Sequence, residues 1–158
     1  MAALNSVAPL WDPTLFVRRL RVIGVKVSQE KTSGYLKRFS STLLKRKNLK
    51  PVQHMTDTTR LLLLDPEKVP TVASVKEMEG MSAMLEEDKS EVVEHDIDLD
   101  YASYTLDEAL RIVLPPEITE IPSSFEIIGH IAHLNLRPAC FPHKEIIGRM
   151  IIDVRISN

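Results

Sequence analysis

The amino-acid sequence predicts an α+β protein, with a small mixed α/β N-terminal domain followed by the opening strand and helix of an incomplete second domain. Segments of β-branched residues or alternating polarity lie between segments whose apolar residues recur with helical spacing. A proline-containing stretch at residues 115–124 separates two parts of different character. The hydrophobic fraction of 44% and the charged fraction of 27% are typical of a soluble globular protein with a buried core.

The first half of the chain predicts a strand, a helix and a second strand. Residues 1–16 are expected to form a flexible leader, and residues 20–27 (LRVIGVKV) predict a strand. Residues 28–47 predict a helix that Pro51 ends, because apolar residues recur near a period of 3.6 with basic residues between them. Residues 58–64 (TTRLLLL) predict the second strand, which Asp65 and Pro66 close.

The middle of the chain is acidic and less regular. Residues 66–92 predict either a helix near 75–85 or a flexible insertion. Apolar residues alternate with aspartates over 96–101, as in a half-exposed strand. Thr105 and Glu108 have the spacing of a capping box, which predicts a helix over 105–114.

The last third predicts one long apolar strand over 125–136 (FEIIGHIAHLNL) and a helix over 142–152, with Pro142 in its first turn. The expected organisation is an N-terminal domain over 17–115, the start of a second domain over 123–153, and a divergent tail at 154–158. A single strand and helix cannot bury both their faces, so this second domain is expected to be incomplete.

Charge is strongly segregated along the chain. Residues 17–50 hold eleven basic residues and one acid, whereas residues 65–108 hold fourteen acids and three lysines, although the whole chain has a net charge of only -2. A cluster of cations is what binding to phosphates requires, but a solvated helix face paired with the acidic segment explains it equally well. The candidate RNA-binding cations are the following: Lys37, Arg38, Lys45, Arg46, Lys47 and Lys50.

The polar residues of the last third suggest a second contact surface. His133, Asn135 and Arg137 would share one face of the predicted strand, where they could touch RNA, orient another domain or form internal hydrogen bonds. His130 and His133 would point to opposite faces of that strand, so no metal site is predicted. The single cysteine, Cys140, lies in no nucleophile motif and is expected to be a buried thiol.

Four segments resemble one known family. They are Arg60–Pro66 (RLLLLDP), Leu106–Pro115 (LDEALRIVLP), Phe125–Arg137 (FEIIGHIAHLNLR) and Pro142–Asp153 (PHKEIIGRMIID). In this order and spacing they resemble the eukaryotic tRNA (guanine-37-N1)-methyltransferases. The resemblance covers about residues 18–153 and implies an N-terminal part only, truncated before the domain that binds S-adenosylmethionine.

The resemblance implies a function that the whole family performs: methylation of N1 of the guanine on the 3′ side of the anticodon. The partner would be tRNA, the chain would be a monomer without membrane contact, and the compartments would be cytoplasm, nucleus and also the mitochondrial matrix. S-adenosylmethionine would be the cofactor of the full-length family.

This chain itself is expected to bind no cofactor and to have no catalytic residue. A cofactor site of the Rossmann type needs glycines at a tight strand-to-helix turn, and no two of the five glycines here lie within nine residues of each other. The chain is therefore expected to keep tRNA binding at most. The alternative is a non-catalytic fragment that interacts with proteins or regulates them.

Overall fold

The computed structural model describes residues 11–122 and 124–156, and it divides into two compact units. The first, here called the sheet unit, is Arg19–Asp98. The second, here called the terminal unit, combines Leu99–Asn158 with the segment up to Arg18. These units do not coincide with the domain boundary that the sequence suggests between residues 115 and 123, which stays a prediction about folding domains.

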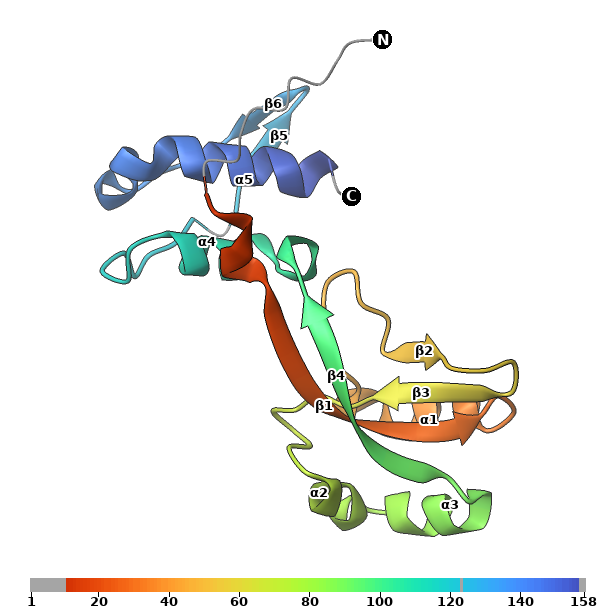
Figure 1. Cartoon of the computed structure of the whole chain (residues 1–158). Coiled ribbons are helices and arrows are strands. Elements are labelled where there is room, and N and C mark those ends of the chain that lie inside the picture. Colours follow the sequence, from red (N-terminus) through yellow and green to blue (C-terminus); the bar gives the residue numbers. More distant parts are fainter. Residues whose placement is uncertain (1–10, 123, 157–158) are drawn as a thin grey trace. The chain divides into compact units, whose positions relative to one another are not determined.

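An antiparallel arrangement of strands organises the sheet unit. Its strands are β1 (Arg18–Ser28), β2 (Val52–His54), β3 (Thr59–Leu63) and β4 (Glu91–Leu99), in the spatial order β2-β3-β1-β4 (Figure 1). Strand β3 pairs antiparallel with β1, with Gly24 opposite Leu63, and also with β2, with Leu62 opposite Val52. The predicted strands at 20–27 and 58–64 are thus confirmed.

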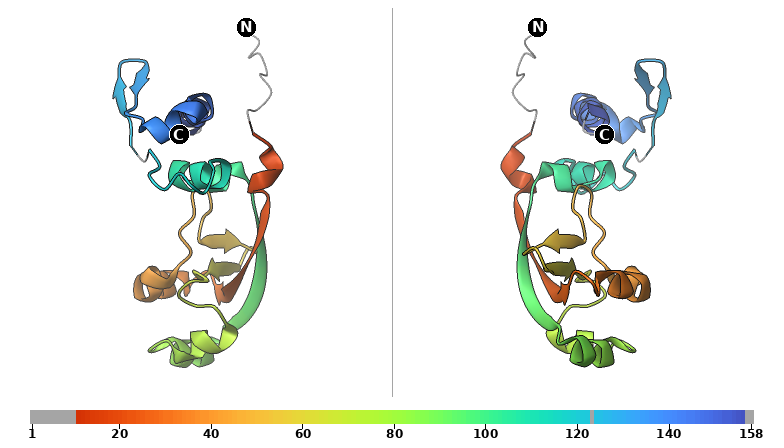
Figure 2. Two further views of the ribbon diagram at one scale, coloured as in Figure 1. Left: turned by 90° about the vertical axis from the view of Figure 1, so that its left-hand side faces the viewer. Right: turned by 90° about the vertical axis from the view of Figure 1, so that its right-hand side faces the viewer.

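Three helices cover one face of this sheet: α1 (Thr32–Phe39), α2 (Val72–Glu77) and α3 (Met81–Asp88). They lie on the same side of β1 and β4 in Figure 2. The core between sheet and helices contains alternate residues of β1, beginning with Ile23, together with Tyr35 and Phe39 of α1 and Met81 of α3. The period of two along β1 therefore supplies one apolar layer for the helices to cover.

The helix predicted over 28–47 is too long. Helix α1 ends at Phe39, a 3-10 turn η2 follows at Ser40–Thr42, and the chain then joins the sheet. The Leu44 amide donates to the Leu63 carbonyl at 2.9 Å, and Leu43 forms a bridge with Leu64. Leucines suit either a helix or a sheet, and here hydrogen bonding to β3 decided the outcome.

The acidic segment holds ordered structure. Helices α2 and α3 are separated by Gly80, which has a left-handed φ of 77°. Of the two alternatives open for residues 66–92, the structure has helices. Strand β4 begins at Glu91 and ends at Leu99, so Tyr101 lies beyond the strand that the sequence predicts, in a 3-10 turn.

The terminal unit is built from helices and one small hairpin. Its helices are η1 (Pro13–Phe16), η3 (Tyr101–Ser103), α4 (Leu106–Val113), η4 (Pro138–His143) and α5 (Lys144–Ile156). Helix α4 contacts both η1 and α5. The predicted capping box is confirmed: the Thr105 amide donates to Glu108 Oε2 at 2.8 Å, and the Glu108 amide donates to the Thr105 hydroxyl.

Residues 125–136 form no single long strand, so that prediction is wrong. Strand β5 (Glu126–Ile128) turns at Gly129 and His130 and pairs antiparallel with β6 (Ile131–His133). Gly129 has φ of 64°, which fits the first central position of a type II′ hairpin turn. The apolar residues on both sides of Gly129, such as Ile127, Ile128 and Ile131, also suit one continuous strand, which concealed this turn.

The ends of the chain also differ from expectation. Residues 1–10 of the expected leader lie outside the described residues, but Trp11 and Phe16 are buried and their rings both contact Tyr101. Helix α5 continues to Ile156, into the expected tail, and begins at Lys144, after Pro142. Within the described part of the chain, no helix is both long and apolar enough to cross a membrane.

Candidate nucleic-acid interface

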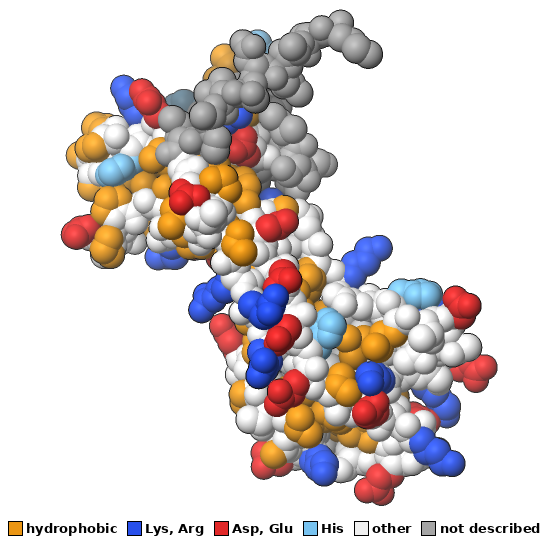
Figure 3. All heavy atoms as spheres, viewed as in Figure 1, with side chains coloured by type: hydrophobic (Ala, Val, Ile, Leu, Met, Phe, Trp, Pro, Cys, Tyr) orange, Lys and Arg blue, Asp and Glu red, His pale blue; other side chains and the backbone are white. Residues whose placement is uncertain are grey.

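The first half of the basic segment is neutralised by acids of β4 and α3. Arg19 and Arg21 each approach an aspartate within 2.9 Å, and these partners are 79 and 75 residues away in the chain. The ion pairs that join these cations to β4 and α3 are Arg19–Asp98, Arg21–Asp96, Arg21–Glu94, Lys26–Glu91 and Lys31–Asp88. Figure 3 shows Lys and Arg side chains interleaved with Asp and Glu side chains along this part of the sheet unit. These cations therefore serve the fold.

Pairing with Arg21 lowers the pKa of Asp96. The hydrogen bond that Arg21 donates, followed by the nearby charges, holds the pKa of Asp96 below its ordinary value of 3.8. The same contact raises the pKa of Arg21. Both groups thus stay charged at neutral pH, and the face that they form carries little net charge.

The second half of the basic segment is arranged differently. Five of the six candidate cations there have no acidic group within 4.0 Å among the described residues, namely Lys37, Arg38, Lys45, Lys47 and Lys50. Lys37, Arg38, Lys45 and Lys50 are exposed and Lys47 is half-buried. Arg46, the sixth candidate, is half-buried and engaged in a local interaction. Positive charge is thus concentrated from the last turn of α1 to Lys50 and has no acidic partner there among the described residues.

Residues 45–50 form a loop, here called the basic loop, which the sheet holds at both ends. Before the loop, Leu44 is hydrogen-bonded to Leu63; after it, the Pro51 carbonyl accepts a hydrogen bond from the Leu63 amide at 2.7 Å. Inside the loop the Leu49 amide donates to the Arg46 carbonyl at 3.3 Å, and Asn48 has φ of 56°. Asparagine tolerates this left-handed conformation better than most residues, so the turn is locally encoded.

The Arg38 side chain is less available for binding RNA than the lysines of the basic loop. Its guanidinium carbon lies 6.0 Å from the centroid of the Phe39 ring, a cation–π contact. The same guanidinium lies against Gly80, where an added Cβ would overlap it. Arg38 therefore joins α1 to the junction of α2 and α3, a structural role that sequence reasoning did not anticipate.

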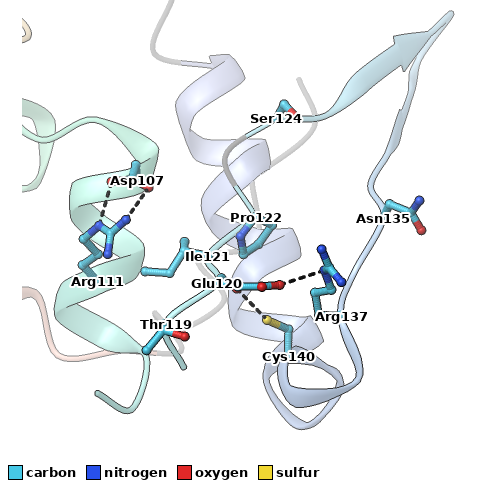
Figure 4. Close-up of a pocket in the computed structure, with 10 residues that line it drawn as sticks. All are labelled: Asp107, Arg111, Thr119, Glu120, Ile121, Pro122, Ser124, Asn135, Arg137 and Cys140. Carbon is cyan, nitrogen blue, oxygen red and sulfur yellow. Dashed lines mark hydrogen bonds and ion pairs between the residues drawn. The ribbon is translucent and has the colours of Figure 1, made fainter. Parts of the chain in front are cut away.

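The terminal unit contains a polar recess of about 500 Å³, which Figure 4 shows in close-up. The recess is lined by residues of α4, of the segment 119–124 and of the segment 135–140. Arg137 Nε forms an ion pair with Glu120 Oε2 at 2.9 Å, and Arg111 Nε donates to Asp107 Oδ2 at 2.8 Å. Asn135 lines the same recess, but in Figure 4 its carboxamide points away from the Glu120–Arg137 pair.

Sequence reasoning found only part of this recess. It singled out Asn135 and Arg137, whereas Glu120, Asp107 and Arg111 were missed. The i, i+4 spacing of Asp107 and Arg111 on one helix was a usable signal. Glu120 had none, because its partner lies 17 residues further along, beyond the hairpin.

His133 belongs to a different pocket. It lines a largely apolar groove of about 800 Å³ together with His130, Leu134, Lys144 and Gly148, among others. The expectation that His133, Asn135 and Arg137 share one strand face is therefore wrong, because β6 ends at His133. The strand geometry that placed His130 and His133 on opposite faces also fails, since His130 lies in the turn. The described residues include no group of three or more His, Cys, Asp or Glu side chains placed to hold a metal ion.

Cys140 is a buried free thiol, as expected, with 1% of its surface exposed. Its Sγ donates to the Glu120 carbonyl at 3.7 Å, and its amide donates to the Arg137 carbonyl at 2.8 Å. One buried residue thus fixes the backbone on both sides of the Glu120–Arg137 pair. This role is structural and needs no reactive thiolate.

Comparisons with known proteins place the chain in a family. Residues 106–157 match the family described as the TYW2 N-terminal domain. A protein of Phytophthora infestans is 37% identical over 154 residues, which cover 92% of this chain and 37% of that protein. Proteins of Xenopus tropicalis and Macaca fascicularis are 32% and 34% identical, over 87% and 90% of this chain and 28% of each relative. No solved structure matches the chain.

All three relatives are named tRNA (guanine(37)-N(1))-methyltransferase, which is the name of a class of enzymes that modify tRNA. The chain belongs to the tRNA (guanine-37-N1)-methyltransferase family, as the four sequence segments suggested. It spans about a third of the length of these relatives, between 28% and 37%, which is consistent with an N-terminal part.

Proposed function

We propose that this chain is the tRNA-holding N-terminal part of a tRNA (guanine-37-N1)-methyltransferase and that its basic loop contacts tRNA phosphates. One observation carries the proposal: β4 and α3 neutralise the cations of β1, whereas Lys45, Lys47 and Lys50 have no acidic partner among the described residues. Four cations of the same basic segment are paired with acids, so the three unpaired lysines stand out as the positive charge that remains for binding phosphates.

The physical basis is the release of counterions. Each phosphate that a lysine or arginine neutralises frees condensed cations from the RNA, so affinity falls as salt concentration rises. The three unpaired lysines of the basic loop predict a slope of about -2.5 in a plot of log affinity against log salt. The anchored basic loop also presents its lysines without a large loss of backbone entropy on binding.

Methyl transfer from S-adenosylmethionine to N1 of guanine is proposed for the whole protein of this family. The residues of this chain would supply positioning of the tRNA, which such a reaction requires because two substrates must meet in one geometry. We assign no cofactor contact and no proton transfer to any residue described here.

The test is binding of the purified chain to unmodified tRNA with guanine at position 37, measured by fluorescence anisotropy over a salt series. A duplex RNA of similar length is the competitor. The double variant Lys45→Ala/Lys50→Ala should reduce the magnitude of the salt slope by about 2. Its matched control, Lys76→Ala/Lys144→Ala, removes two other exposed lysines and should leave the slope unchanged.

Equal effects of the two double variants would show that only net charge matters, and the basic loop would lose its assigned role. Absence of tRNA binding at low salt would leave the alternative of a protein-interaction fragment. One observation favours that alternative: the hairpin exposes Ile127, Ile128 and Ile131, which are 49%, 66% and 60% accessible.

A further inference from the structure

We propose that the polar recess of the terminal unit holds one unpaired base of RNA, whose hydrogen-bonding edge meets the Glu120–Arg137 pair. The proposal rests on the proposed function and adds to it a second contact of a different kind. The basic loop would bind phosphates without regard to sequence, whereas the recess would bind a base.

The charge balance of the recess selects a neutral ligand. Its two guanidinium groups, of Arg111 and Arg137, are each paired with a carboxylate, of Asp107 and Glu120. The four charges sum to zero, so a phosphate would gain little attraction there and would meet two carboxylates. A ligand without charge that offers both donors and acceptors fits this arrangement better.

The Glu120–Arg137 pair provides a donor and an acceptor side by side. The ion pair joins Arg137 Nε to Glu120 Oε2 at 2.9 Å, and a guanidinium and a carboxylate each have further donor or acceptor positions that a ligand can use. Both side chains are solvent-accessible, at 73% and 67%, so a ligand can reach them. Nucleic-acid bases likewise set donors beside acceptors on one edge, and pairing in a duplex covers that edge. The recess therefore suits an unpaired base.

The walls of the recess are suited to hold a flat ring in place. Ile121 and Pro122 line it and are half-buried, which gives a base an apolar surface to pack against. Arginine guanidinium planes also stack on bases, and Arg111 lies on the facing wall (Figure 4). Cys140 holds the backbone of both Glu120 and Arg137, so the pair is positioned before any ligand arrives.

The experiment is a titration of the isotope-labelled 158-residue chain followed by amide chemical shifts. Three probes are added separately: a single-stranded RNA tetranucleotide, the same tetranucleotide with abasic sites at all four positions, and inorganic phosphate. We expect the intact tetranucleotide to shift the amides of residues 120, 121, 137 and 140. The abasic tetranucleotide and phosphate should leave them in place.

Variants separate the recess from the basic loop. Glu120→Gln and Arg137→Gln should each weaken the tetranucleotide at the recess by about tenfold, the range typical of one lost hydrogen-bonding pair to a base. Glu126→Gln is the matched control, because Glu126 is an exposed carboxylate in β5 of the same unit and does not line the recess. It should change nothing, and neither should Lys45→Ala/Lys50→Ala.

Two results would overturn the proposal. One is that the abasic tetranucleotide or phosphate shifts the recess amides as strongly as the intact tetranucleotide. The other is that shifts occur only at residues 45–50, which would leave the proposed function standing and the recess without a ligand. Conversely, recess shifts in a chain that does not bind tRNA would count against the proposed function alone.

Discussion

At the scale of single residues, Tyr35 and Tyr101 show how differently one residue type can contribute. The Tyr35 hydroxyl is paired with Ser90 Oγ at 3.2 Å. The Tyr101 hydroxyl is buried without a hydrogen-bond partner among the described residues, and burial raises its pKa to about 12. Burying an unsatisfied hydroxyl costs stability that a phenylalanine would not cost.

We therefore predict that Tyr101→Phe leaves the free energy of unfolding unchanged or raises it slightly. Tyr35→Phe should lower the free energy of unfolding by about 0.5–1.5 kcal/mol, because the substitution removes the hydrogen bond to Ser90 and leaves the Ser90 hydroxyl without that partner. Urea unfolding of the two variants beside the parent chain measures both effects. A loss of stability in Tyr101→Phe equal to that of Tyr35→Phe would show that Tyr101 has a partner after all.

A second prediction at this scale concerns acid. Because the folded-state pKa of Asp96 is lowered, its contribution to stability is present above the ordinary value of 3.8 and is lost as pH falls through the folded-state pKa. The melting temperature of Asp96→Asn should accordingly fall less steeply than that of the parent chain below pH 4. The exposed and unpaired Asp57, changed to Asn, is the control and should follow the parent curve. Parallel curves for all three proteins would contradict the prediction.

At the scale of elements, sequence patterns identified structure where the pattern was local. The capping box at Thr105 and the β-branched run of β1 were sufficient, because neighbours in the chain determine those conformations. The end of α1 was not predictable, since Leu43 and Leu44 suit a helix equally well and only β3 draws them away. The hairpin was missed although Gly129 is a common turn residue, because Ile127, Ile128 and Ile131 on either side of it also suit one continuous strand.

The hairpin provides the prediction at this scale. Gly129→Val should destabilise the β5–β6 turn by about 1–2 kcal/mol, because a β-branched residue is strained at the φ of 64° found there. Amide hydrogen exchange at residues 127–132 should become faster, while exchange in α5 stays the same. Gly148→Ala is the control: nothing lies within 4 Å of its added Cβ, and alanine favours the helix.

At the scale of the whole molecule, the basic and acidic runs of the sequence meet in the folded chain. Acids of β4 and α3 pair with Arg19, Arg21, Lys26 and Lys31, whereas the lysines of the basic loop stay without an acidic partner among the described residues. The opposite runs were visible in the sequence, but their register was not, since each partner lies 55 or more residues away. Only the pairing of β1 with β4 decides which cations are neutralised. The cations of the basic loop could be predicted from the sequence because they are neighbours in the chain. The contact between Glu120 and Arg137 could not, because it depends on how the chain folds.

This pairing leads to a prediction about selectivity. The variant Asp96→Asn/Asp98→Asn removes the aspartate partners of Arg19 and Arg21, leaving Arg21 only its longer pair with Glu94 at 3.7 Å. It should raise affinity for duplex RNA by about tenfold at moderate salt. The preference for tRNA over duplex RNA should fall correspondingly, which competition anisotropy measures. Glu67→Gln/Glu79→Gln changes net charge equally without freeing a paired arginine. If it had the same effect, the acids of β4 would act only through total charge.

The exposed isoleucines of the hairpin also have a practical consequence for handling the protein. A ribbon of two short strands has unpaired edges, and here it carries apolar side chains into water, so molecules in a concentrated solution can adhere to one another there. Light scattering should therefore grow with protein concentration and with ammonium sulfate, unlike the RNA contacts, which salt weakens. Threonine at positions 128 and 131 would retain strand propensity, and we expect such a chain to remain clear at concentrations where the parent becomes turbid.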